Sequence, residues 1–205
     1  MTDGLQTLAT AIEDCAAWRW WIQSGDLVQL EFIWPQLARR SAERAIPVPI
    51  DAVALTFEDV SEFAFLTRTG ADDVPADWPM QMANDTLDFD AVPTSISFEH
   101  FALNDDAAAE RARAVPHRVQ WVLQASPERD ELMPSYHLVF WAGLVGAHVI
   151  GASLRVRTHD GDLSLRDMDE LRDAWWEYWR AYWARRGSPD ALPYDPSCET
   201  VIPFK

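Results

Sequence analysis

Apolar and polar residues alternate most clearly between positions 18 and 34, in the stretch WRWWIQSGDLVQLEFIW. Two runs rich in aromatic and β-branched residues flank the polar segment Ser24-Gly25-Asp26, whose glycine suits a tight reversal of the chain. In the second run every other residue is apolar, so one face of a strand would be apolar and the other polar. The pattern predicts a β-hairpin with strands near 17–23 and 27–34, and Pro35 ends the second strand because it cannot donate to the ladder.

Similar apolar runs recur between turn residues along the chain. They predict strands at 51–58, 60–67, 94–101, 117–124, 136–141 and 144–157. Residues 60–67 are expected either as a second strand or as a continuation of 51–58 past a bulge. Ala142-Gly143 divides the most apolar part of the chain and predicts a tight turn, and Asp160-Gly161 predicts another. The pattern V-x-L-x-F occurs in two of these runs, which fits ordinary strand patterning or two related halves.

Helical spacing is found near both ends of the chain. Apolar residues three or four positions apart predict a helix over about 4–16. A longer helix is predicted from Ser164 to Arg186, because Ser164 can cap its start and Gly187 suits the position after its end. A short third helix is expected at 106–114.

The long helix is unusually aromatic. Its apolar residues form two neighbouring lines, one through Met168, Leu171, Trp175, Trp179 and Tyr182 and the other through Trp176 and Trp183. A straight surface helix cannot turn both lines toward a single sheet, so either the C-terminal tail or another chain should cover the outer one. We expect the tail, residues 188–205, to pack on the chain's own body, with Trp176 or Trp183 partly exposed beside it.

These elements predict an α+β fold in a single domain, residues 1–205. Strands follow strands through short turns, so we expect a mainly antiparallel sheet of about eight strands. The N-terminal helix and the long C-terminal helix should pack on it. Residues 68–93 are expected as a long loop anchored by its apolar side chains. The predicted core residues are Leu30, Phe32, Leu55, Phe57, Ile96, Phe98, Leu138 and Phe140.

The formal net charge of −16 is unevenly placed. Residues 1–110 hold 20 acidic and 5 basic residues, whereas residues 111–205 hold 13 acidic and 12 basic residues. Such a charge repels phosphates, so we expect no nucleic acid as a direct ligand. The balance fits a basic protein partner or simply a soluble surface.

Cysteine usage and hydropathy favour a cytoplasmic protein. Cys15 and Cys198 lie far apart and have no metal-ligand spacing, which fits a reducing compartment. The first residues lack the basic segment and apolar run of a signal peptide. No apolar run reaches the roughly 18 residues that a membrane-spanning helix needs, so we expect no membrane association.

One pair of histidines suggests a site. A two-residue turn at Ala142-Gly143 would place His137 opposite His148 on neighbouring strands, close enough to share a metal ion or a proton. A metal needs further ligands, which the sequence does not place nearby, so a surface pair or a shifted register is the alternative interpretation. The chain lacks the common nucleotide-binding, hydrolase and metalloprotease motifs. We therefore expect no cofactor and no bound metal.

The 11 tryptophans could line a ligand cavity, fill the core or form a partner surface. Composition favours a non-enzymatic cytoplasmic protein-binding module with an acidic N-terminal half, similar in its charge balance to bacterial inhibitor or immunity proteins. An alternative is an enzyme or a small-ligand-binding domain with a Trp-lined pocket, for which the candidate residues are His137, His148, Trp141, Trp176 and Trp183. A second alternative is a ligand-free homo-oligomer that uses the C-terminal helix.

Overall fold

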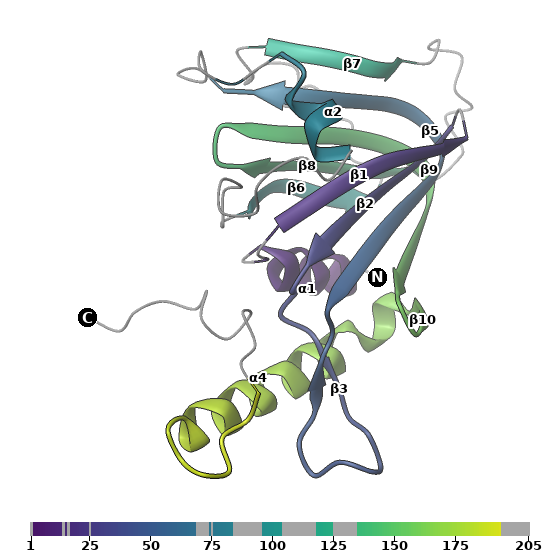
Figure 1. The fold of residues 1–205 in the computed structure, drawn as a ribbon. Helices are drawn as coiled ribbons and strands as arrows, with labels where there is room; N and C mark the ends of the chain where they lie inside the picture. The colour runs from purple at the N-terminus through teal and green to yellow at the C-terminus, as the bar shows by residue number, and fades with distance from the viewer. Residues whose placement is uncertain are drawn as a thin grey trace.

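The computed structural model describes residues 2–13, 15, 17–24, 26–68, 74, 76–83, 96–103, 118–124 and 135–193. Within them the chain has the predicted α+β fold, with a curled antiparallel sheet and a helix from each end of the described chain (Figure 1). The elements are α1 (Thr2–Ile12), β1 (Ala17–Ser24), β2 (Leu27–Ile33), β3 (Ala38–Arg39), β4 (Val48–Pro49), β5 (Ala52–Thr67), α2 (Trp78–Ala83), β6 (Ile96–Leu103), β7 (Arg118–Gln124), β8 (Tyr136–Ala142), β9 (Val145–Thr158), β10 (Gly161–Leu163), the 3₁₀ turn η2 (Leu165–Asp167) and α4 (Met168–Arg185).

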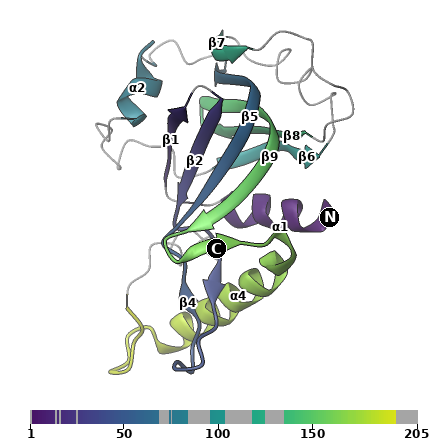
Figure 2. The same ribbon diagram turned by 90° about the vertical axis from the view of Figure 1, so that its right-hand side faces the viewer.

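The main sheet, as far as the described residues go, has eight strands in the order β1-β2-β5-β9-β8-β6, with β7 beside β5 and β10 beside β9. β2 pairs with residues 52–57 of β5 and β7 pairs with residues 62–67, so both lie on the edge of β5 that faces away from β9. A bulge between Val60 and Glu62 bends β5 where its partner changes. The predicted strands at 51–58 and 60–67 are therefore one bulged strand, and Figure 2 shows β7 above the β1–β2 hairpin.

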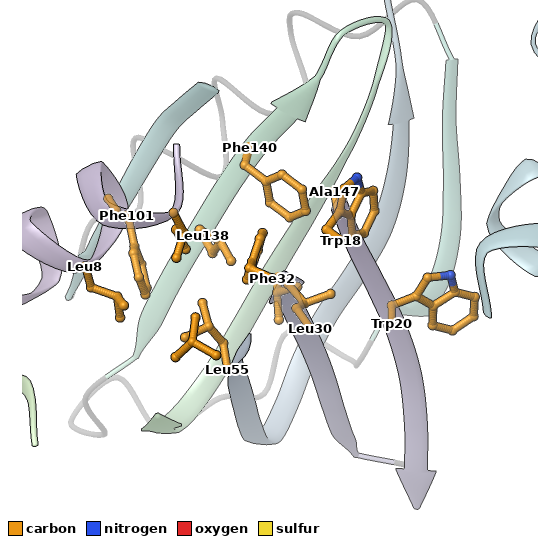
Figure 3. Close-up of a cluster of buried hydrophobic side chains, with 14 of the residues drawn as sticks. Leu8, Trp18, Trp20, Leu30, Phe32, Leu55, Phe101, Leu138, Phe140 and Ala147 are labelled. Atoms are coloured by element: carbon orange, nitrogen blue, oxygen red, sulfur yellow. The ribbon is translucent and has the colours of Figure 1, made fainter. Parts of the chain in front are cut away.

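The apolar face of the sheet encloses a core (Figure 3). Six of the predicted core residues are fully buried, namely Leu30, Phe32, Leu55, Phe57, Leu138 and Phe140. The side chains of Ile96 and Phe98 lie outside the described residues. Trp18 contacts Phe140 edge to face at 4.7 Å between ring centroids, so the β1–β2 hairpin packs over β8. The helix α1 adds Leu8 to the same core, since its apolar stripe faces the sheet.

A short helix, α2, lies within the segment that we expected to be a loop. Trp78 is buried and contacts Phe65 at 5.2 Å between ring centroids. The indole Nε1 of Trp20 donates a hydrogen bond to the carbonyl oxygen of Pro79 at 2.7 Å. These contacts attach α2 to β1 and β5, as the anchoring role of its apolar side chains predicted. Most of the remaining predicted loop, and the predicted helix at 106–114, lie outside the described residues.

The C-terminal helix α4 occupies nearly the predicted range. Ser164 caps the preceding 3₁₀ turn η2, because its Oγ accepts a hydrogen bond from the backbone N of Arg166 at 3.2 Å, whereas the N-cap of α4 itself, Asp167, makes no side-chain capping bond. α4 packs mainly on α1 and on the two-stranded ribbon β3–β4, at one end of the sheet (Figure 2). Its buried side chains are Met168, Ala174, Trp175, Tyr178 and Tyr182. Trp179, predicted on the inner line, is half-buried and packs against the buried residues Ala38, Ala174 and Trp175.

Two turns differ from their predicted positions by one residue. The central residues of the β8–β9 turn are Gly143 and Leu144, as the pairing of Ala142 with Val145 shows. Gly143 takes the first central position with a φ of 63°, which glycine adopts at little cost. The second turn is His159-Asp160, and Gly161 already belongs to β10. None of the helices described combines the length and the apolar character needed to cross a membrane.

Candidate functional site

A groove with a volume of about 510 Å³ lies between the β3–β4 ribbon, the C-terminal half of α4 and the residues that follow this helix. Its apolar lining comes mainly from Trp34, Ile46, Pro47, Val48, Tyr178 and Leu192. Arg44, Asp51 and Arg185 add charged groups to it. The volume and this mixture of apolar walls with few charged groups are typical of ligand sites.

The β3–β4 ribbon forms one wall of the groove. Its base is buried in the protein, whereas its tip is exposed. Leu37 and Ala38 are fully buried, and the backbone N of Ile50 donates to the carbonyl oxygen of Leu37 at 2.9 Å. Residues 40–45 at the tip are exposed. Pro47 and Pro49 favour extended backbone in the returning strand, which keeps this wall straight.

Trp34, at the bottom of the ribbon, has a backbone conformation that is unusual for a bulky residue. Its φ is 60°, in the left-handed region, and its backbone N donates to the carbonyl oxygen of Asp51 at 2.7 Å. Such a conformation costs on the order of 1–3 kcal/mol and persists only where the surroundings impose it, which is frequent at functional sites. The strained residue here lines the groove.

α4 and the residues after it form the opposite wall. Tyr178 and Tyr182 are buried and stack with 6.4 Å between ring centroids, and Leu192 packs against them. The hydroxyl of Tyr178 donates to the carbonyl oxygen of Pro193 at 3.3 Å. The first part of the tail, residues 188–193, therefore packs on the chain's own body as predicted, but against Tyr178 and Tyr182, whereas the prediction placed it over the outer line; Trp183 is 37% exposed. Residues 194–205 lie outside the described part of the chain.

The charged groups of the groove differ in how they are paired. Arg44 and Asp51 are exposed, and neither side chain has a partner among the residues that the structure describes. The Nε of Arg185 is 3.9 Å from Asp190, whose pKa is lowered mainly by a hydrogen bond from the hydroxyl of Ser188 at 2.6 Å. By contrast, the neighbouring Arg40 is paired with Glu177 at 3.1 Å. The groove thus presents an unpaired guanidinium group and an unpaired carboxylate beside an apolar surface.

The predicted histidine pair lies elsewhere, on the outer face of the sheet. His137 is opposite Ile150 and His148 is opposite Val139, so the two histidines are diagonal neighbours and not opposite each other as predicted. This difference follows from the shifted turn at Gly143-Leu144.

Both histidines are buried and have polar neighbours. The Nε2 of His137 is 2.9 Å from the Oγ of Ser135, and the Nδ1 of His148 is 3.9 Å from a carboxylate oxygen of Glu62. In the part of the chain that is described, no three His, Cys, Asp or Glu side chains are grouped so as to hold a metal ion. Whether the purified protein binds a metal stays a prediction.

The other three candidate residues fall in two places. Trp141 is buried on the same face of β8 as His137, and the Arg68 guanidinium lies 4.3 Å from the centroid of its ring. Trp176 and Trp183 belong to α4, which lies at the other end of the molecule from the β8–β9 turn (Figures 1 and 2).

None of the five candidates lines the groove described here. The signals that could have indicated it are the sequence Trp34-Pro35 and the extended segment 46–49, which follows a polar tip. A scan of the chain against protein-family models finds no match, and no curated protein matches it significantly.

Proposed function

We propose that the protein is a non-enzymatic binding module whose groove, between the β3–β4 ribbon and α4, receives an extended apolar segment of a partner protein. The observation that carries the proposal is the 510 Å³ groove itself, with mostly apolar walls, a strained tryptophan in its lining and two charged groups, Arg44 and Asp51, that have no partner in the described part of the chain. Among the described residues that line the groove, no nucleophile and base are placed side by side.

The shape of the groove favours a protein segment over a small molecule. Small-ligand sites usually enclose most of the surface of their ligand, whereas this groove is more open to solvent than an enclosed cavity. Addition of a strand to β4 is disfavoured, because Pro49 has no backbone N–H to donate. Recognition would therefore come from side chains, as in aromatic-lined grooves that bind extended segments, with Trp34 and Tyr178 as the aromatic surfaces.

The charges indicate which polar group the segment carries. Arg44 can donate two parallel hydrogen bonds to a carboxylate, while Asp51 lines the same groove and the charge of Arg185 is partly offset by Asp190 at 3.9 Å. We therefore expect a segment that combines apolar residues with an acidic side chain that reaches Arg44. The expected basic partner for the acidic N-terminal half concerns another surface, much of which lies outside the described residues, and it stays a separate prediction.

A random peptide library displayed on phage tests this proposal directly. Selection on the wild-type protein should enrich peptides that contain apolar residues together with Asp or Glu. Arg44→Glu should weaken the binding of a selected peptide at least about tenfold, which corresponds to roughly 1.4 kcal/mol. The affinity would be measured by fluorescence anisotropy of the labelled peptide.

Arg166→Glu is the matched control, since Arg166 is also exposed but lies in η2 and does not line the groove. Its affinity for the peptide should equal that of the wild type. Selection without any shared pattern, or a peptide that binds Arg44→Glu as tightly as the wild type, would contradict the proposal.

A further inference from the structure

A second surface on α4 lies on a different face of the helix from the groove. Asp173, Trp176 and Arg180 are spaced by three and four residues, so they share one face of the helix. Asp173 and Arg180 are exposed and Trp176 is half-buried. The aromatic surface continues from Trp176 to Trp179 at 5.6 Å and from there to Trp183 at 6.1 Å between ring centroids.

The charged residues of this face are not paired within the described chain. Glu170 and Glu177 both lie within ion-pair distance of Arg40, and the Arg186 guanidinium lies 4.5 Å from the centroid of the Trp183 ring. Asp173 and Arg180, in contrast, have no side-chain partner among the described residues. They are two helical turns apart, about 10 Å along the axis, so they cannot pair with each other in one helix.

This arrangement is self-complementary. In an antiparallel pair of identical helices with the two-fold axis beside Trp176, Asp173 of each copy lies opposite Arg180 of the other. The contact between Asp173 of one copy and Arg180 of the other therefore occurs twice, as a two-fold interface requires. We propose that the protein forms a homodimer through this face of α4, with the two Trp176 rings at its centre and two Asp173–Arg180 ion pairs beside them.

The two kinds of contact have different roles. The tryptophan rings supply most of the binding energy, because large aromatic side chains at the centre of an interface usually do. The ion pairs lie at the rim and mainly determine the antiparallel direction and the register. One pair of helices buries less surface than a standard interface, so we expect a Kd in the micromolar range, on the order of 1–10 μM.

Charge reversal tests the dimer by sedimentation velocity over a range of concentrations. Asp173→Arg places like charges opposite each other and should raise the Kd at least about tenfold, and Arg180→Asp should do the same. The double variant restores both ion pairs in reversed orientation, and its Kd should return to within about threefold of the wild type. Asp26→Arg and Arg166→Asp are matched controls at exposed positions outside α4, and both should dimerise like the wild type.

Three results would overturn the inference. The first is a wild-type protein that stays monomeric up to about 100 μM, a concentration at which a micromolar dimer would predominate. The second is a dimer whose Kd does not respond to the single reversals or whose double variant is not restored. The third is a wild-type monomer that dimerises only after removal of residues 194–205, which would assign this face of α4 to the chain's own tail. Because the surface is separate from the groove, dimerisation and peptide binding can fail independently.

Discussion

The core of the sheet and the α4–ribbon end of the molecule are held together by different interactions. In the core, aromatic rings from several strands interlock, for example Phe32 on Phe140 at 5.4 Å and Trp20 on Phe63 at 5.6 Å between centroids. At the other end the ribbon is held partly by exposed ion pairs, such as Arg39 to Asp160 at 2.6 Å. Deleting a buried ring costs several kcal/mol, whereas an exposed ion pair contributes about 0–1 kcal/mol. The exposed ion pairs of the α4–ribbon end therefore add less to stability than the interlocked rings of the core, and this end relies on its own buried side chains, such as Trp175 and Leu37.

The largest expected loss of stability comes from a cavity in the core. Phe57 is fully buried, so Phe57→Ala should lower the free energy of unfolding by about 3–5 kcal/mol through lost transfer energy and an unfilled cavity. Urea denaturation followed by tryptophan fluorescence measures this loss. Val122→Ala, at an exposed position of β7, is the control and should change the free energy by less than about 0.5 kcal/mol. Similar midpoints for the two variants would refute the assignment of strand faces.

A medium effect is expected where the two regions meet. A Cβ added to Gly4 of α1 would lie 2.2 Å from the carbonyl oxygen of Leu165 in η2. Gly4→Ala should therefore destabilise the protein by about 1–3 kcal/mol, although alanine alone favours a helix by roughly 1 kcal/mol. Thermal unfolding followed by circular dichroism measures the change. Gln6→Ala, at an exposed position of the same helix, should be nearly neutral, and a stabilising Gly4→Ala would rule out the close approach of α1 and η2.

The smallest effect concerns the segment after α4. The hydroxyl of Ser188 donates to Asp190 and lowers the pKa of this carboxyl below 3.8. The hydrogen bond therefore stabilises the folded state at pH values above 3.8 and ceases to do so as the pH falls through the lowered pKa. Ser188→Ala should raise the pKa of Asp190, and an NMR titration of its carboxyl carbon measures this shift. An unchanged pKa would show that residues 188–190 do not hold this turn in solution.

Local patterns predicted most elements of the fold but not how α4 is packed. The alternation in 27–34 predicted both β2 and its buried face, because one face of a half-buried strand packs on the core and the other faces water. The spacing of apolar residues predicted α1 and α4 for the equivalent reason in helices. Trp179, predicted on the inner line of α4, is half-buried and packs against a buried cluster that includes Ala38 of the ribbon, an element that the sequence pattern did not reveal.

The register of β8 on β9 shows why the candidate site was harder to predict. A turn displaced by one residue changes the partner of His137 from His148 to Ile150. Glycine can take either central position of such a turn, and only the pairing of β8 with β9 shows that Gly143 takes the first. The groove depends on still more distant contacts, because Asp51, Tyr178 and Leu192 come together only when the ribbon and α4 pack.

The sequence by itself determined the α+β class, the antiparallel strands, the buried face of the hairpin and the extent of the terminal helix. Each of these follows from a repeat of two or about 3.6 residues, which a single segment carries. The tertiary structure alone decided the pairing of the bulged strand β5 with β2 and β7 along one edge, the position of α4 against the ribbon, and the groove between the ribbon and α4. These features depend on contacts between residues far apart in the chain. Local periodicity fits several ways of packing the helices and strands together, and only the shapes of the packed side chains select one of them.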